Sequence, residues 1–287
     1  MHQGYPKETL VRFLKAREWN VSKAHKMIVD SLNWRIQNEI DSVLERPIVP
    51  VDLYRSIRDS QLIGLSGYTK EGLPVFGIGV GHSTYDKASV HYYVQSHIQI
   101  NEYRDRIILP RLTQQFGQPV TKCIKVLDMT GLKLSALSQI KILTSISTVD
   151  DLNYPEKTET YYVVNVPCIF SACWYYQLPL IFRFAMLNIC RLWTTRHFPI
   201  SAAGRALDHQ SIHLLTSTTA SPLTILSTKE LYDHIKEQAS CRELIKMGSL
   251  HVSIPEPDPD DAKIVEVIQA EFQKIGEQDE SPNGNKD

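Results

Sequence analysis

Apolar residues recur at helical spacing close to the amino terminus of the chain. They predict a helix over residues 6–17 that starts with Pro6 in its first turn. Asn20 interrupts this pattern, and Ser22 is the expected N-cap of a second helix. Prolines at positions 47 and 50 then mark a linker. The pattern therefore predicts a helical hairpin, which we place at residues 5–47.

A different rhythm begins at residue 73, where short apolar strands alternate with longer helical segments. Strands are predicted at residues 73–80, 122–129 and 161–166, with helices at residues 89–108 and 134–147 between them. Pro110 is expected to end the first of these helices. Strands that alternate with helices are typical of an α/β fold whose sheet contains parallel pairs.

The regular pattern stops after Trp174. Residues 175–228 show neither a helical period nor a strand rhythm, and they include the nearly low-complexity run HLLTSTTASPLTILST, so an irregular segment is expected there. A helix is predicted from Lys229 and a short strand at residues 250–254. A final amphipathic helix is expected from residue 260 or 261, and the polar tail from Gly276 is expected to be disordered. The main domain is therefore placed at residues 52–254 and the carboxy-terminal region at 259–287.

The composition narrows the class of protein. Lysine and arginine total 31 against 32 for aspartate and glutamate, so the net charge of −1 gives no global basic field for nucleic acid. The five cysteines form no CxxC pair, which indicates free thiols. The first residues lack the apolar segment of a secretory signal. The apolar stretch 166–190 contains Arg183, and an arginine inside a bilayer costs about 3 kcal/mol, so we do not expect a membrane span.

Three glycines alternate at the end of the first predicted strand: Gly77, Gly79 and Gly81. A dinucleotide-binding fingerprint requires G-x-G-x-x-G at the opening of a helix, whereas these glycines lead into a loop. Close approach of another part of the backbone or of a ligand to one face of the strand is therefore the preferred interpretation.

Asp150, Asp151, Glu156 and Glu159 form an acidic group that could serve acid–base or metal chemistry. No histidine lies near them in the sequence to complete a metal site. We interpret the group as a solvated turn with one helix cap. We therefore predict no metal, no cofactor and no catalytic residue, and the chain is not expected to be an enzyme.

Several motifs of the chain are specific when they are taken together. The string from Leu10 to Arg17, followed by Asn20-Val21 and Trp34-Arg35, resembles the amino-terminal module of the CRAL-TRIO family of lipid-binding proteins. The strand Lys125–Met129 with Gly131, and the segment Asn153–Lys157 with the residues up to Ser171, resemble its lipid-binding domain. The motifs occur in family order and spacing over residues 5–174, with a weaker match at 229–254. Within the family, the chain looks most like plant phosphatidylinositol/phosphatidylcholine transfer proteins.

The resemblance implies an α/β CRAL-TRIO fold. A helical hairpin, which we expect to be truncated at its start in this chain, joins a mixed or parallel sheet flanked by helices around an apolar lipid pocket. In the family, a mobile gate helix closes over a pocket that buries the acyl chains, at about 0.8 kcal/mol per CH₂. A few polar groups must then hold the headgroup, because unpaired buried charge is costly.

The phosphoinositide site of the family uses an arginine of the hairpin and a glutamate after Tyr-Pro. The resemblance places these roles at Arg17 and Glu156. Arg17 would hold phosphate through its guanidinium fork, and Glu156 would accept inositol hydroxyls or orient Arg17. Alternatively, the two residues form a structural ion pair between the hairpin and the main domain. The implied pocket lining consists of Val126, Asp128, Tyr161, Val163 and Phe170.

The chain departs from the family pattern near both headgroup positions. Glu18 stands where the family has a basic residue, which weakens the positive field. In the best-known members of the family, hydroxyl residues hold phosphatidylcholine. This chain has Cys123 and Lys125 at those positions. We therefore expect phosphatidylinositol, rather than phosphatidylcholine, to be the preferred ligand.

The gate helix of the family would fall within the irregular segment at residues 175–228. The codons from Ile189 to Ile212 can also be read in a shifted frame, in which each new codon consists of the third base of one codon and the first two bases of the next. This shifted frame permits the string MQIMDYASLPHFCRREGSGSSKH. This string resembles the missing family segment, including its Leu-Pro-x-x-Phe loop. We therefore hypothesise that the segment is translated out of frame, as in a splice variant, and that the gate helix is missing in this form.

These observations predict phospholipid binding and transfer between membranes, with phosphatidylinositol as the preferred lipid. The protein is expected to be a cytoplasmic monomer that associates transiently with Golgi or plasma membranes. Two alternatives stay open: a lipid sensor or adaptor that does not transfer lipid, and a carrier of another small hydrophobic ligand such as a terpenoid.

Overall fold

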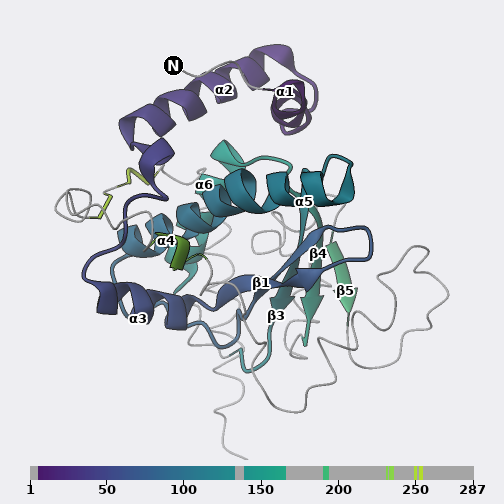
Figure 1. Cartoon of the computed structure of the whole chain (residues 1–287). Coiled ribbons are helices and arrows are strands. Elements are labelled where there is room, and N and C mark those ends of the chain that lie inside the picture. Colours follow the sequence, from purple (N-terminus) through teal and green to yellow (C-terminus); the bar gives the residue numbers. More distant parts are fainter. Residues whose placement is uncertain are drawn as a thin grey trace, which may run out of the picture.

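The structure, a computed structural model, describes residues 6–132, 139–165, 190–193, 231, 233–235, 249–250 and 252–254. In chain order, its elements are α1 (Lys7–Lys15), α2 (Val21–Gln37), the 3-10 helix η1 (Ile40–Ser42), α3 (Val51–Gln61), β1 (Ile63–Tyr68), β2 (Pro74–Ile78), α4 (Val90–Tyr103), the π-helix η2 (Arg104–Ile108), α5 (Leu109–Phe116), β3 (Cys123–Asp128), α6 (Ile140–Asn153), β4 (Thr158–Val164) and β5 (Cys190–Trp193). The expected α/β class, a helical hairpin with a sheet flanked by helices, is confirmed (Figure 1).

The described strands form one mixed sheet in the order β1-β2-β3-β4-β5. Strands β2 to β5 run parallel, whereas β1 pairs antiparallel with β2. Strand β1 escapes the sequence pattern because its residues IGLSGY include two glycines and no clear alternation. The expectation of an irregular segment at residues 175–228 is wrong for β5, which pairs with residues 161–164 of β4. The pairing forms hydrogen bonds between backbone N–H and C=O groups, which do not depend on the side chains, so this strand can form without an alternating apolar sequence.

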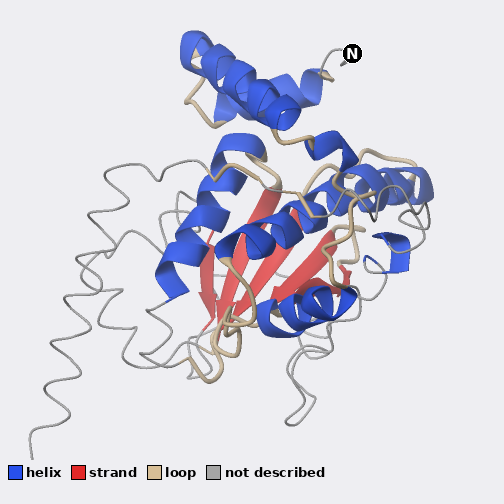
Figure 2. Cartoon of the chain, turned by 90° about the vertical axis from the view of Figure 1, so that its left-hand side faces the viewer, coloured by secondary structure: helices blue, strands red, loops and turns tan. Residues whose placement is uncertain are grey.

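The two faces of the sheet differ. Cross-strand partners share a face and successive residues alternate between faces. One face carries Leu65, Phe76 and Cys123, which join the main hydrophobic core with residues of α3, α4, α5 and α6. Figure 2 shows helices lying across this sheet. The opposite face carries a smaller apolar cluster that consists of Val75, Ile124, Val126 and Tyr162.

The predicted hairpin of α1 and α2 is confirmed, but α2 begins earlier than expected. Asn20, and not Ser22, is its N-cap, because the Asn20 side-chain oxygen accepts a hydrogen bond from the backbone N–H of Lys23 at 3.0 Å. Asparagine caps helices as well as serine does, and Asn20 lies directly after the turn that ends α1. The hairpin stands apart from the sheet at the top of Figure 1.

Contrary to the prediction from the sequence, Pro110 does not end the long central helix. Helix α4 continues through the π-helix η2 into α5, which ends at Phe116 before Gly117 with a φ of 65°. The wide π turn starts a new hydrogen-bonding register, so Pro110 falls in the first turn of α5. A proline is tolerated there because the first N–H groups of a helix have no partner within it.

Helix α3 follows the proline linker directly and has no counterpart in the sequence-based prediction. Its buried side is half polar, with Tyr54 and Ile57 next to Ser60 and Gln61. A helix whose buried face contains polar residues gives a weak apolar period. Ser60 nevertheless finds a buried partner in the hydroxyl of Tyr93, at 2.6 Å.

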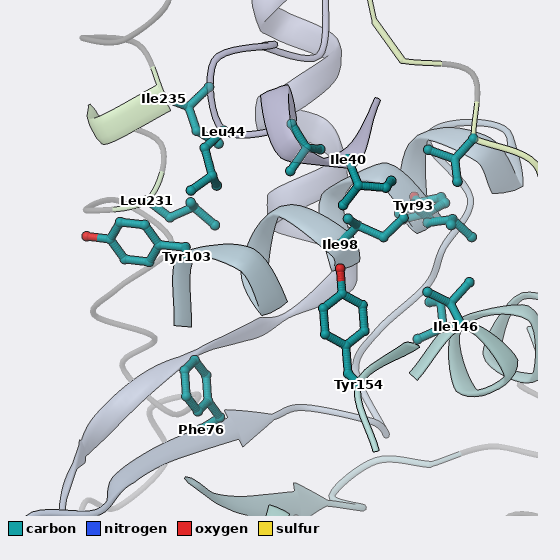
Figure 3. Close-up of a cluster of buried hydrophobic side chains, with 14 of the residues drawn as sticks. Ile40, Leu44, Phe76, Tyr93, Ile98, Tyr103, Ile146, Tyr154, Leu231 and Ile235 are labelled. Atoms are coloured by element: carbon teal, nitrogen blue, oxygen red, sulfur yellow. The ribbon is translucent and has the colours of Figure 1, made fainter. Parts of the chain in front are cut away.

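Short segments from the carboxy-terminal third return to the core. Leu231 and Ile235 lie in the main core with Leu44 and Tyr103 (Figure 3), and the helix predicted from Lys229 is confirmed at residues 231 and 233–235. Residues 250 and 252–254 form no strand, contrary to the prediction. Instead, the backbone oxygen of Ser253 accepts a hydrogen bond from the Trp34 indole at 3.0 Å, and the Ser253 N–H donates to the Asn38 side chain at 2.6 Å. The backbone of Ser253 therefore binds to α2 and to the residue that caps its carboxy-terminal end, and not to a strand.

Other predictions for the last third lie outside the described residues. They concern Phe170, the final helix, the polar tail, and the segment 175–228 apart from β5. The domain boundaries stay predictions. Within the described part of the chain, no helix is long and apolar enough to cross a membrane.

Candidate functional site

Arg17 lies in the turn of the hairpin, between the end of α1 and the cap of α2. Its guanidinium donates one hydrogen bond, from Nη1 to the backbone oxygen of Ala16 at 3.0 Å. Among the described residues, no acidic side chain forms an ion pair with it. An arginine fork has five N–H donors, so most of them stay available for a ligand.

The Arg17 side chain lines a cleft of about 420 Å³ between the hairpin and the end of α6. The rest of the lining is Lys23, Lys26, Met27, Asp30, Ser31, Trp34, Leu152 and Asn153. Three cations against one carboxylate make the cleft basic, although the whole chain carries a net charge of −1. The cleft therefore suits an anionic ligand with a small apolar part.

Two polar atoms of this lining lack a hydrogen-bond partner among the described residues. They are the hydroxyl oxygen of Ser31 and the side-chain oxygen of Asn153, and both are buried. A buried polar group without a partner costs about 1–3 kcal/mol. Because both atoms are covered, neither offers a hydrogen bond to a ligand in the cleft with the side chains in these positions.

Glu156 lies three residues after Asn153, beyond the end of α6, in a left-handed conformation with a φ of 57°. It is not among the residues that line the cleft. No ion pair or hydrogen bond joins it to Arg17 in the described part of the chain. The structure therefore brings Arg17, but not the Glu156 side chain, to the cleft, and the role of Glu156 stays a prediction.

A buried ion pair holds α2 against α4. The Arg35 guanidinium donates to both carboxylate oxygens of Glu102, at 2.7 and 3.1 Å, and only 3% of the Glu102 side chain is exposed. The Tyr154 hydroxyl donates to the same carboxylate at 2.7 Å, and burial first, then Glu102, raises the pKa of Tyr154. The pair fixes the position of the helix that carries the lysines of the cleft.

A second buried ionic group connects α4, β3 and α6. Asp150 accepts from Asn101 at 2.6 Å and lies 2.8 Å from His97 Nε2 and 3.2 Å from Lys125 Nζ. Burial opposes the charge on Asp150, but His97 and Lys125 outweigh it and hold the pKa of this carboxyl well below its ordinary value. The interpretation of the acidic group as a solvated turn is therefore wrong for Asp150, because its partners come from distant elements.

The predicted pocket-lining residues do not share one face of the sheet. In the parallel register, Lys125 pairs with Tyr161 and Val126 pairs with Tyr162. Val126 and Asp128 therefore lie on one face, whereas Tyr161 and Val163 lie on the helix-covered face with Lys125. Asp128 also accepts hydrogen bonds from Thr130 and Asn165 beyond its strand. One cavity on one face can include only two of these four described residues.

The interpretation of the glycines as places of close approach is confirmed at Gly81. A Cβ atom there would lie 2.1 Å from the carbonyl oxygen of Thr130. At Gly79 the nearest atom would be Leu62 Cβ at 3.3 Å. The described residues contain no group of three or more His, Cys, Asp or Glu side chains that could hold a metal ion.

Sequence reasoning missed the lysines of the cleft and the buried ion pairs. Lys23, Lys26 and Trp34 could have been found, because positions 23, 26, 27, 30, 31 and 34 fall on one face of a helix that follows Arg17. The partners of Glu102 and Asp150 could not have been found in the same way. Apart from Arg106, which is four residues from Glu102, the side chains that pair with these two carboxylates lie 25 to 67 residues away in the chain.

Comparison with known proteins agrees with this architecture. The N-terminal domain of CRAL/TRIO proteins matches residues 1–30, and the CRAL/TRIO domain matches residues 58–182. Protein real-time of Drosophila melanogaster is 29% identical over 184 residues, which cover 58% of this chain and 26% of that protein. The phosphatidylinositol/phosphatidylcholine transfer protein SFH9 of Arabidopsis thaliana is 23% identical over 179 residues, or 60% of this chain and 30% of that protein. SEC14 cytosolic factor of Eremothecium gossypii is 26% identical over 171 residues, or 57% and 54%.

The two domain matches together span more than half of the chain, in the order hairpin then sheet domain. The chain therefore belongs to the CRAL-TRIO family. It spans about a quarter of the length of the first curated relatives that it matches. The crystal structure of Sfh5 overlays with a TM-score of 0.49 and 17% identity over 95% of this chain and 84% of that chain, a likeness too distant to support a statement about function.

Proposed function

We propose that this chain binds a phospholipid with an inositol phosphate headgroup and carries it between membranes. The observation that carries the proposal is the position of Arg17. The arginine that family resemblance assigns to the headgroup faces a basic cleft together with Lys23 and Lys26. Relatives whose names state phosphatidylinositol/phosphatidylcholine transfer support the same ligand class.

The chemistry of the cleft favours phosphatidylinositol over phosphatidylcholine. A guanidinium fork binds phosphate through two parallel hydrogen bonds, and two lysines add positive charge. Phosphatidylinositol is anionic, whereas the choline group brings a cation that three basic side chains would repel. Lys125, which stands where a phosphatidylcholine-binding hydroxyl is expected, is occupied by its ion pair with Asp150. Both arguments point to an anionic headgroup.

The face of the sheet on which α6 packs is filled by the main hydrophobic core and by the ion pair of Lys125 with Asp150. Among the described residues, the opposite face carries only the smaller cluster that consists of Val75, Ile124, Val126 and Tyr162. We therefore assign the acyl chains to this opposite face. A photo-crosslinking residue at position 126 should label bound lipid, whereas one at position 163 should not.

The headgroup assignment is tested with Arg17→Ala. Removing a charge-assisted hydrogen bond should lower phosphatidylinositol binding about tenfold or more, and Arg17→Lys should lie between this variant and the wild type. Arg55→Ala is the matched control, since Arg55 is exposed on α3 and pairs only weakly with Asp52 at 3.6 Å. Lipid bound per protein is measured by mass spectrometry, and transfer by a vesicle-to-vesicle assay. Unchanged phosphatidylinositol binding in Arg17→Ala, or an equal loss of phosphatidylinositol and phosphatidylcholine binding, would contradict the proposal. If the wild type binds lipid but does not transfer it, a lipid sensor is favoured.

A further inference from the structure

The turn between α1 and α2 exposes large apolar side chains. Trp19 is 61% exposed and Val21 is 72% exposed, although residues of this type are usually covered. Glu18 and Trp19 both adopt the left-handed conformation, with φ values of 52° and 63°. The Trp19 N–H donates to the Leu14 oxygen at 2.8 Å, which closes the end of α1. The backbone is therefore held in the conformation that turns the Trp19 side chain to solvent.

Basic residues flank this apolar tip in the sequence. Lys15, Lys23 and Lys26 are exposed and Arg17 is half-buried, whereas Glu18 is the only acidic residue between positions 15 and 26. The segment of twelve residues thus carries a formal charge of +3 in a chain of net charge −1. An indole with cations around it has the composition of a site that binds at the interface of an anionic membrane.

We infer that the hairpin turn at residues 15–26 docks on the surface of an anionic membrane, with Trp19 and Val21 inserted among the headgroups. Figure 1 shows the hairpin at the end of the molecule opposite the sheet, so that this turn can reach a flat surface. The cations draw the turn to the anionic lipids, and the two apolar side chains leave water on contact. Docking in this way places the basic cleft, whose lining begins at Arg17, next to the headgroups of the membrane.

This inference goes beyond the proposed function, because Trp19, Val21 and Lys15 do not line the cleft. A chain that holds no headgroup in the cleft can still dock by this turn. A chain that holds the headgroup can equally lose docking when only these three side chains change. The two proposals can therefore fail separately.

The test uses co-sedimentation with vesicles of phosphatidylcholine alone and of phosphatidylcholine mixed with phosphatidylserine. Trp19→Ala combined with Val21→Ala should lower the affinity for mixed vesicles about tenfold or more, because two apolar side chains no longer leave water. Lys15→Gln should lower it about fivefold, the effect of one charge near an anionic surface. Raised salt should weaken the wild type, since it screens exposed charges.

The matched control combines Ile36→Ala with Val51→Ala. Both side chains are exposed apolar residues, at 65% and 47%, and Ile36 lies about 22 Å from Val21 along α2. The control should bind mixed vesicles like the wild type, and both double variants should keep the wild-type melting temperature. Retained lipid content in the Trp19 and Val21 variant would show that only docking is lost. Wild-type vesicle affinity in that variant, or equal binding of the wild type to both vesicle types, would overturn the inference.

Discussion

Arg35→Met removes the buried charge that fixes the hairpin against the sheet domain. The methionine keeps most of the apolar stem but leaves the Glu102 carboxylate, of which 3% is exposed, without its main partner. Two contacts persist, the Tyr154 hydroxyl at 2.7 Å and the half-exposed Arg106 at 3.7 Å. The exposed Asp41, which also pairs with Arg35, loses little.

The expected cost follows from burial and distance. Breaking a buried pair by removing one partner costs about 3–5 kcal/mol, because the remaining charge cannot reach water. Since Arg106 compensates Glu102 in part, we expect a loss at the low end, about 3 kcal/mol. In Arg35→Met combined with Glu102→Gln, no charge is stranded and Tyr154 keeps an acceptor. The double variant should therefore lose about 2 kcal/mol less free energy of unfolding than the sum of the losses in Arg35→Met and Glu102→Gln.

Urea unfolding measures these free energies, with Arg55→Met as the control. Arg55 forms an exposed pair with Asp52, which contributes about 0–1 kcal/mol. A second readout is phosphatidylinositol binding, which should fall in Arg35→Met because α2 carries Lys23 and Lys26 although no residue of the cleft has changed. The reasoning is refuted if Arg35→Met loses no more stability than Arg55→Met. It is also refuted if the losses of Arg35→Met and Glu102→Gln simply add up in the double variant.

Two further predictions concern the buried ionic group and the close backbone approach. Because its partners hold the pKa of Asp150 below the unfolded value of about 3.9, Asp150 stabilises the fold fully above about pH 5, and this contribution is lost as the pH falls below about 4. Asp150→Asn should therefore be less stable at pH 7 and lose less stability on acidification; equal pH slopes in urea titrations would contradict this. Gly81→Ala should cost about 2 kcal/mol or more because the new methyl meets backbone, whereas Gly79→Ala meets a side chain at a longer distance and should cost less. Thermal unfolding compares the two, and similar melting temperatures would show that the contact at Gly81 is not restrictive.

The parts of the fold that the sequence predicted have a strong local pattern. Helix α1 has apolar residues at helical spacing, and strands β3 and β4 contain short runs of valine, isoleucine, leucine or tyrosine, so neighbouring positions suffice to recognise them. Helix α3 and strand β1 have no such pattern, because α3 buries Ser60 and Gln61 and β1 contains two glycines. The continuation of the helix past Pro110 was not predictable, because the π turn that accommodates this proline has no pattern in the sequence.

Only the side of the candidate site that the hairpin forms was predictable from the sequence. Family resemblance selects Arg17, and helical spacing extends the same face to Lys23 and Lys26. The remaining wall comes from Leu152 and Asn153, more than a hundred residues further along the chain. Their place depends on the packing of α2 against α6 and on the ion pair of Arg35 with Glu102.

The sequence by itself determined the family of this protein, the helical hairpin and the parallel arrangement of β2, β3 and β4. These properties depend on motifs and periods that neighbouring residues carry. Only the tertiary structure decided that Asp150 is a buried ion-pair partner, that Val126 and Tyr161 lie on opposite faces of the sheet, and that Trp19 is exposed at a basic turn. Burial, register and charge pairing depend on segments that are distant in the chain, and these meet only when the chain has packed.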